Sequence, residues 1–187
     1  MDKKEIIMES AIKVIAVNGF HNTSVKMIAD KAGIAVGTIY NHFSNKDEIL
    51  NYIFKREFEK RIKLLIKLKE ENIGFTEKLS LFLNSHFDDL SENPDKAIVL
   101  VQESRVPQNH SLESINDFME KLPQVLSEML NEAMKRGEIR VVNQELIAST
   151  IFHVIREVAF MIVNDPHNDY SKAKEELLNF IWVGLQK

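Results

Sequence analysis

The side chains with the clearest chemistry in this 187-residue sequence lie close together, between Thr23 and Lys46. Hydroxyl, amide, imidazole and ammonium groups recur there, and such groups donate hydrogen bonds to phosphate oxygens and base edges. Nothing similar suits catalysis, because His86, His110, His153 and His167 are scattered and no metal-binding or glycine-rich phosphate motif occurs. The sequence has no cysteine, which excludes thiolate zinc sites and cysteine nucleophiles. We therefore expect no catalytic residue, no metal and no cofactor.

The elements that must position these side chains are helices. Apolar residues recur at spacings of three and four almost throughout, and this period predicts an all-α fold of about nine helices. Gly19 and Gly33 are expected to end the first two helices, Thr23 to cap the start of the second, and Pro123 to kink or split a later one. The expected helices are Lys3–Asn18, Ser24–Ala32, Val36–Phe43, a long helix beginning after Ser44 or Asn45, and then Thr76–Ser91, Pro94–Val106, Ser111–Arg136, Gln144–Val163 and Ser171–Gln186.

The third expected helix has two unlike faces. On a helical wheel, its apolar arc holds Val36, Ile39, Tyr40 and Phe43, and its small and polar side holds Gly37, Thr38, Asn41 and His42. A glycine costs a helix about 1 kcal/mol relative to alanine. We interpret Gly37 as clearance that lets the start of the helix approach base edges and phosphates, as the second helix of a helix-turn-helix does.

Charge is unevenly divided along the chain. Residues 1–63 hold 11 Lys and Arg against 8 Asp and Glu, whereas residues 64–187 hold 13 against 20. The basic end favours an anionic partner for the first part of the chain only. Hydrophobic residues make up 44 % of the sequence, enough for a packed core, but no run of eighteen apolar residues occurs. We expect a cytoplasmic protein without a membrane partner.

The run "TSVKMIADKAGIAVGTIYNHFSNKDEIL" resembles the DNA-binding segment of the TetR family of transcriptional regulators. The resemblance rests on a small-residue-rich second helix, an "AG" turn, "GTIY", "HF" and an acidic restart. It implies a helix-turn-helix domain over residues 1–46 and an effector-binding and dimerisation domain over 47–187. The implied function is a homodimeric repressor that binds double-stranded, palindromic operator DNA and is released by a small hydrophobic effector.

The resemblance also places the DNA contacts. Ala35 stands where many members have a capping Ser or Thr, and Val36 cannot hydrogen-bond a base edge, although it can pack on a thymine methyl. Three alternatives stay open: Tyr40 as a core residue, Asn41 and His42 as ordinary solvated surface, and Lys46 as an ordinary surface lysine. The implied DNA contacts are Thr23, Ser24, Lys26, Val36, Gly37, Thr38, Tyr40, Asn41, His42 and Lys46.

The C-terminal part holds the expected effector site. "PDKAIVLVQESRV" and "KRGEIR" are similar to a branch of the family that regulates fatty-acid degradation and responds to acyl-CoA thioesters. Arg105 would then face the anionic head of the effector, unless Arg105 and Arg156 simply pair with neighbouring carboxylates. A regulator that responds to cationic drugs or other lipophilic compounds is the alternative. The candidate lining is Phe82, His86, Phe87, Val101, Arg105, Phe118, Met119, Leu122, Phe152 and Arg156.

The last two expected helices carry wide apolar arcs, which suit packing on both a core and a twin. The alternative is that both are interior helices of a monomer. For the whole chain, a helical protein-interaction module without DNA binding is the rival from another class. The candidate dimer interface is Ile151, Val154, Ile155, Val158, Leu178, Ile181, Trp182 and Leu185.

Overall fold

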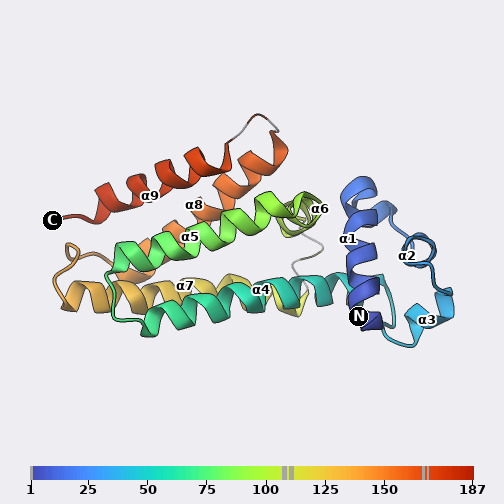
Figure 1. Cartoon of the computed structure of the whole chain (residues 1–187). Helices are drawn as coiled ribbons and strands as arrows, with labels where there is room; N and C mark the ends of the chain where they lie inside the picture. Colours follow the sequence, from blue (N-terminus) through green and yellow to red (C-terminus); the bar gives the residue numbers. More distant parts are fainter. Residues whose placement is uncertain (1, 107–108, 110–111, 166, 168) are drawn as a thin grey trace. The chain divides into compact units, whose positions relative to one another are not determined.

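The computed structural model describes residues 2–106, 109, 112–165, 167 and 169–187, and this part of the chain is built from helices without a strand (Figure 1). The expected all-α class is confirmed, with most expected helices present. Their bounds are α1 Lys3–Asn22, α2 Val25–Ala32, α3 Val36–Tyr40, α4 Lys46–Glu70, α5 Phe75–Glu92, α6 Pro94–Ile98, the π-helix η1 Val99–Glu103, α7 Glu113–Lys135, α8 Gln144–Asn164 and α9 Tyr170–Leu185.

The first two helices end at glycines, as expected. Gly19 interrupts α1 with φ 73° and ψ 155°, and one short turn follows before α2. Gly33 ends α2 in the left-handed conformation, where a residue without Cβ carries no steric penalty. The cap at the start of α2 differs from the expectation. Ser24 supplies it, accepting a hydrogen bond from the Met27 N–H at 3.2 Å, while Thr23 is buried.

The third helix is shorter than expected, because it ends at Tyr40, and Asn41 and His42 continue as a turn. The long helix α4 then starts at once through a reciprocal cap. Asn45 Oδ1 accepts the Glu48 N–H at 2.8 Å, and Glu48 Oε2 accepts the Ser44 N–H at 2.6 Å. This exchange satisfies donors that a helix start otherwise leaves open, so α4 follows α3 without a spacer.

The segment expected as one helix over 94–106 is two elements. α6 ends at Ile98, and the chain continues as the π-helix η1. Short π-helical turns are rare and often lie at functional sites. Pro123, in contrast, does not split α7, which runs through it.

The chain forms two compact units, each with its own core. One consists of Met1–Phe58 with Asn93–Asn116, and the other of Glu59–Glu92 with Asp117–Lys187. The first therefore holds α1 to α3, the start of α4, α6 and η1. The second holds the rest of α4, α5, α8, α9 and most of α7. The boundary expected between residues 46 and 47 stays a prediction.

Helix α8 is the one described helix whose length and composition would allow a membrane span. In the structure, one of its faces is buried in the core of the second unit. That face consists of Ala148, Ile151, Phe152, Ile155, Ala159 and Ile162. The spacing is that of a helix packed along one side, and Leu146 and Met161 remain exposed on the other.

Candidate functional site

The polar side of α3 and of the turn after it is open, and its apolar side is closed. Ile39 and Phe43 are buried in the core of the first unit, whereas Gly37 and Asn41 are exposed. Thr38, His42 and Val36 are half-buried. Phe43 packs edge-on against Tyr52 of α4, with ring centroids 5.4 Å apart. The helix is thus fixed from beneath and presents small and polar groups outward.

Tyr40 corrects the wheel analysis. The expected arc placed this side chain with Ile39 and Phe43, but it is 55 % exposed. The helix ends at Tyr40, so the periodicity that assigned its direction ends there too. The core alternative for Tyr40 is therefore wrong.

Gly37 has no structural reason to be glycine. Its φ is not positive, and a Cβ built on it would meet nothing within 4 Å. An alanine would fit and would favour the helix. The absence of a side chain is therefore left to be explained by something outside the protomer, which agrees with the predicted approach to a duplex.

On α2, Ser24 and Lys26 are exposed and Thr23 is not. The Thr23 side chain is 3 % exposed, and its hydroxyl donates to the Gly19 carbonyl at 2.8 Å. This threonine therefore stabilises the corner between α1 and α2. The expectation that its side chain contacts DNA is corrected here, because the hydroxyl is bonded inside the protein.

Lys46 also has an internal role. Its Nζ donates to the carbonyls of Phe20, His21 and Thr23 at 3.0, 3.0 and 3.1 Å, and it lies 4.6 Å from the centre of the Phe20 ring. An ammonium group has three hydrogens, and three carbonyls take them. Lys46 therefore closes the C-terminal end of α1 and is not a plain surface lysine, while the expected phosphate contact stays a prediction.

The expected effector residues fall into both units. Val101 and Arg105 belong to the first unit, and the other eight to the second. In the second unit, Phe118 packs edge-on against Phe152 at 5.6 Å, and the Arg156 guanidinium lies 5.6 Å from the Phe152 ring centre. Arg156 is therefore held on an aromatic face. The buried members of the set are Phe82, Phe87, Val101, Phe118, Leu122 and Phe152, while His86, Arg105, Met119 and Arg156 are half-buried.

His86 belongs to a polar cluster that the sequence analysis missed. The buried Arg61 donates from Nε to His86 Nδ1 at 3.1 Å and from Nη2 to Asp89 at 2.8 Å. Burial, with the Arg61 charge second, lowers the pKa of His86 from 6.5 to about 3. A cavity of about 10 Å³ beside this cluster has room for about one water. The sequence gives no sign that Arg61 is buried, because charged residues on a helix such as α4 are usually exposed. Among the described residues, His, Asp and Glu do not gather in threes as a metal site requires.

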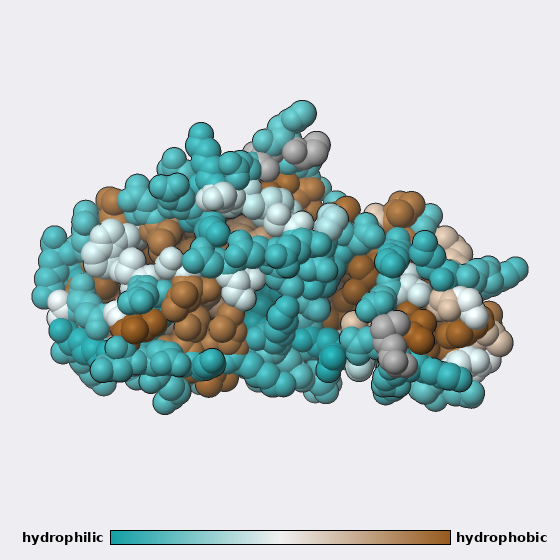
Figure 2. Space-filling view, in the orientation of Figure 1, coloured by the Kyte–Doolittle hydropathy of each residue, from teal (hydrophilic) through white to brown (hydrophobic). Residues whose placement is uncertain are grey.

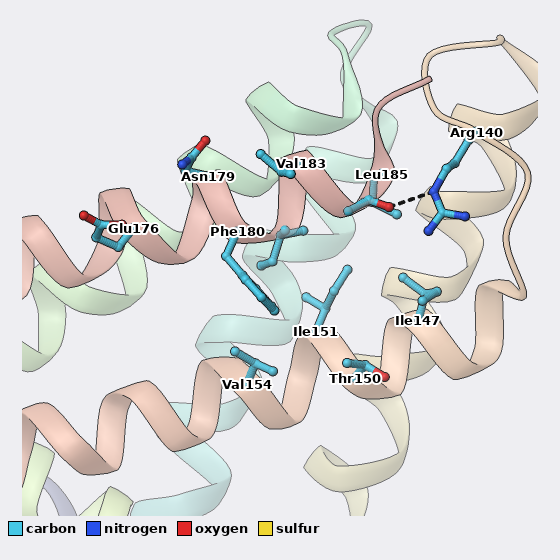
Figure 3. Close-up of a pocket in the computed structure, with 12 residues that line it drawn as sticks. Arg140, Ile147, Thr150, Ile151, Val154, Glu176, Asn179, Phe180, Val183 and Leu185 are labelled. Atoms are coloured by element: carbon cyan, nitrogen blue, oxygen red, sulfur yellow. Dashed lines mark hydrogen bonds between the residues drawn. The ribbon is translucent and has the colours of Figure 1, made fainter.

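The segment "KRGEIR" serves the fold of the second unit. Gly137 turns the chain after α7 with φ 70°. Glu138 Oε2 accepts the Phe75 N–H at the start of α5, at 2.8 Å. Arg140 donates from Nε to the Gly184 carbonyl at 2.8 Å and from its backbone N–H to the Leu185 carbonyl at 2.9 Å, at the end of α9 (Figure 3). Residues that resemble a ligand-specific signature thus cap three helices.

A groove of about 570 Å³ runs between α8 and α9 (Figure 3). Phe180 projects from α9 toward α8 in this groove and is 66 % exposed, and Val183 is 57 % exposed. Of the residues expected at a dimer interface, Ile151, Ile155, Ile181 and Leu185 are buried, although Ile151, Ile181 and Leu185 line this groove, and the interface stays a prediction. The other four, Val154, Val158, Leu178 and Trp182, are half-buried. The helical period identified apolar arcs but not which part of each arc faces inward.

Exposed apolar residues also occur outside this groove. Figure 2 shows apolar surface over α4 and α5. Of the residues on these helices, Ile66 and Leu81 are 43 % and 44 % exposed. Both are more covered than Phe180 and Val183. The α8–α9 face is thus the more open apolar surface of the second unit.

Comparison with known proteins covers nearly the whole chain. Residues 7–53 match the model of bacterial regulatory proteins of the tetR family, and residues 54–184 match that of the C-terminal region of YsiA-like proteins. The fatty acid metabolism regulator protein of Bacillus subtilis is 32 % identical over 181 residues, which is 96 % of this chain and 93 % of that protein.

Solved structures agree with this result. The regulator FadR from Bacillus subtilis in complex with stearoyl-CoA has a TM-score of 0.87 at 32 % identity, covering 96 % of this chain and 97 % of that one. The fatty acid degradation regulator FadR from Bacillus halodurans has a TM-score of 0.88 at 28 % identity, covering 97 % and 95 %. SmeT, the repressor of a multidrug efflux pump of Stenotrophomonas maltophilia, is 20 % identical and shows the fold alone.

Proposed function

Because this chain belongs to the TetR family of bacterial regulatory proteins and is a DNA-binding transcriptional regulator, we propose that it is a homodimeric repressor released from its operator by a long-chain acyl-CoA. The observation that carries the effector class is the similarity, over nearly the full length of both chains, to a regulator whose structure holds stearoyl-CoA. We also place the protein in the cytoplasm, where operator DNA and acyl-CoA meet.

The proposed DNA surface is the outward side of α2, α3 and the turn after α3. Gly37 and Asn41 face base edges, Val36 packs on a thymine methyl, and Lys26 and Tyr40 hold phosphates. Ser24, Thr38 and His42 complete this surface. The support lies in exposure and chemistry, because these groups surround a helix whose opposite side is buried through Ile39 and Phe43. Thr23 and Lys46 support the surface from inside.

The proposed acyl-binding site requires the core of the second unit to open. Sites for small ligands usually measure about 300–1,000 Å³. The cavity beside Phe82 and His86 is only about 10 Å³. Phe118, Leu122 and Phe152 are buried in the core of the second unit. An acyl chain would therefore enter by displacing aromatic side chains. Such a ligand releases DNA only if it binds the opened and closed states unequally.

The proposed dimer forms through α8 and α9, with a second copy of this chain in the groove. An open apolar face with Leu146, Phe180 and Val183 exposed suits a two-fold contact of identical surfaces. A palindromic operator needs two recognition helices about one DNA turn apart, roughly 34 Å or a multiple of that distance. Dimerisation through the second unit leaves both helix-turn-helix domains available to bind the operator.

The test is a gel-shift assay of the purified protein with DNA from its own upstream region, at two salt concentrations. Stearoyl-CoA, a short-chain acyl-CoA and free CoA are added in parallel, together with a panel of cationic drugs. We expect specific, salt-sensitive binding that stearoyl-CoA releases and free CoA does not. Release by a cationic drug alone would keep the repressor and replace the effector class. Absence of specific binding to regional and genomic DNA would contradict the proposal and favour a protein-interaction module.

A further inference from the structure

The corner between α1 and α2 is held by two side chains from distant parts of the first unit. After Gly19 leaves helical geometry, the Phe20 N–H has left the regular ladder of α1 and donates instead to Glu103 Oε1 at 2.9 Å. On the other side, Lys46 takes the carbonyls of Phe20, His21 and Thr23. The Glu103 carboxylate and the Lys46 ammonium thus both bind the turn between α1 and α2, and together they fix the direction in which α2 leaves α1.

Glu103 has an unusual environment for a carboxylate. It is 9 % exposed, and its second oxygen accepts a hydrogen bond from Asn109 Nδ2 at 3.0 Å. The same Asn109 nitrogen donates to the Glu103 carbonyl at 3.0 Å, and Asn109 is 6 % exposed. A buried carboxylate is costly unless donors satisfy it. Here the donors are the Phe20 N–H and the Asn109 amide. The corner between α1 and α2 therefore supplies one of the two hydrogen bonds that compensate for the burial of the Glu103 side-chain oxygens.

The element that carries Glu103 is the π-helix η1. Glu103 is its last residue, and η1 follows α6 without a break. Rewinding a π turn to an α turn changes the direction of the side chains after it, because the hydrogen bonds shift from i→i+5 to i→i+4. A change in winding at η1 would therefore carry the Glu103 carboxylate away from Phe20. Such a rewinding would be a discrete rearrangement, as a switch needs.

We propose that Glu103 is a positioning residue for DNA binding, which holds α2 and α3 in place through the Phe20 N–H, and that η1 is the element through which an effector acts on this hold. The second half of the proposal rests on the proposed effector response. Glu103 itself touches no DNA surface: it is buried beneath the corner, whereas the proposed DNA contacts are exposed on α2, α3 and the turn after α3.

The test compares Glu103→Ala, Glu103→Gln and the control Ser114→Ala in the full-length protein. Ala removes the acceptor of the Phe20 N–H, whereas the Gln amide oxygen can still accept it. Ser114 bonds Asn51 of α4 through its hydroxyl and its N–H, at 2.7 and 3.2 Å, in the same unit but away from the corner. Its alanine variant therefore loses a partly buried hydrogen bond of the same unit without touching Phe20.

Three quantities are measured: operator affinity, amide hydrogen exchange over residues 19–24, and the ratio of operator affinities without and with stearoyl-CoA. For Glu103→Ala we expect about a tenfold or greater loss of operator affinity, faster exchange at the corner, and a ratio closer to one. For Glu103→Gln and Ser114→Ala we expect affinities within about threefold of wild type.

Wild-type operator affinity in Glu103→Ala would overturn the proposal. So would equal losses in Glu103→Ala and Ser114→Ala, because such losses would reflect general destabilisation. Failure of the proposed effector is read separately, from a wild-type protein that binds its operator and ignores stearoyl-CoA. In that case the affinity and exchange comparison still confirms or overturns the positioning role of Glu103.

Discussion

Arg61 Nε donates a hydrogen bond to His86 Nδ1 over 3.1 Å, and this contact defines the protonation of the histidine. Arg61 cannot lose its proton in a protein, so Nδ1 must be the acceptor and the ring is neutral with its hydrogen on Nε2. Burial, with the Arg61 charge as second cause, lowers the pKa of His86 to about 3. The ring also stacks on Phe82, with centroids 6.2 Å apart.

This pairing predicts a pH dependence of stability. The pKa of His86 is about 3 in the folded protein and near 6.5 in the unfolded chain. The unfolded chain therefore binds the additional proton below pH 6.5, and stability falls as pH decreases from there toward 3. One such proton is worth about 1.4 kcal/mol per pH unit. Urea unfolding at pH 7.5, 6.5 and 5.5 measures the loss.

The matched variant for this prediction is His86→Gln, which keeps an oxygen that can accept from Arg61. We expect its free energy of unfolding to change less between pH 7.5 and 5.5, by about 1 kcal/mol, than that of the wild type. Other histidines titrate in both proteins and cancel in the difference. Parallel pH profiles would contradict the prediction, because they would show that folding does not lower the pKa of His86.

Replacing Lys26 and replacing Lys46 are predicted to change the salt dependence of operator affinity differently. A lysine on a phosphate releases counterions, so Lys26→Ala should weaken operator binding and reduce the slope of log affinity against log salt by about one. Lys46→Gln should weaken binding without changing that slope, because its ammonium is bonded to three carbonyls. Fluorescence anisotropy at five salt concentrations separates the two. A reduced slope in Lys46→Gln would show that Lys46 contacts a phosphate.

Stability and operator affinity should move apart at Gly37. A Cβ there meets nothing in the protomer, so Gly37→Ala should keep or raise the free energy of unfolding, by about 0.5–1 kcal/mol. Gly37→Leu should fold and dimerise normally yet lose about tenfold or more in operator affinity, since its side chain projects where the duplex must approach. Thermal unfolding and gel shift measure the two properties. Wild-type affinity in Gly37→Leu would show that this helix start does not meet the duplex.

The proposed dimer is tested with Phe180→Glu and the control Leu81→Glu. Both put a charge at an exposed apolar position of the second unit, on α9 and α5. A charge buried without a partner in an interface is strongly unfavourable. We expect Phe180→Glu to give a monomer in analytical ultracentrifugation at micromolar concentration, with weakened binding to the palindromic operator. Leu81→Glu should remain dimeric, and the reverse pattern would move the interface to α4 and α5.

Glu138 is predicted to matter for stability alone. Glu138→Ala removes the acceptor of the Phe75 N–H and should lower the free energy of unfolding by about 1 kcal/mol. Glu138→Gln keeps an acceptor and should lose less. Operator binding and the response to stearoyl-CoA should be unchanged in both. A changed acyl-CoA response with intact stability would return the "KRGEIR" segment to the effector site.

Local features of this fold could be predicted because they depend on neighbours in the sequence. Gly33 ends α2, and Asn45 with Glu48 caps α4, through hydrogen bonds between residues three or four positions apart. The same locality explains the errors. Helix periodicity cannot say that Tyr40 is the last residue of its helix, or that Thr23 turns inward beside Gly19.

By itself, the sequence determined most of the helices, the glycines that end the first two, the cap of α4, the two-faced third helix and the family. These follow from period, turn chemistry and motif, all of which act over a few residues. Only the tertiary structure decided the partners of Lys46, the pairing of Arg61 with His86, the hold of Glu103 on Phe20, and which side of α8 and α9 is buried. Each of these contacts joins residues many positions apart in the sequence, or depends on which other helix packs against a given face. A local sequence pattern cannot predict such contacts.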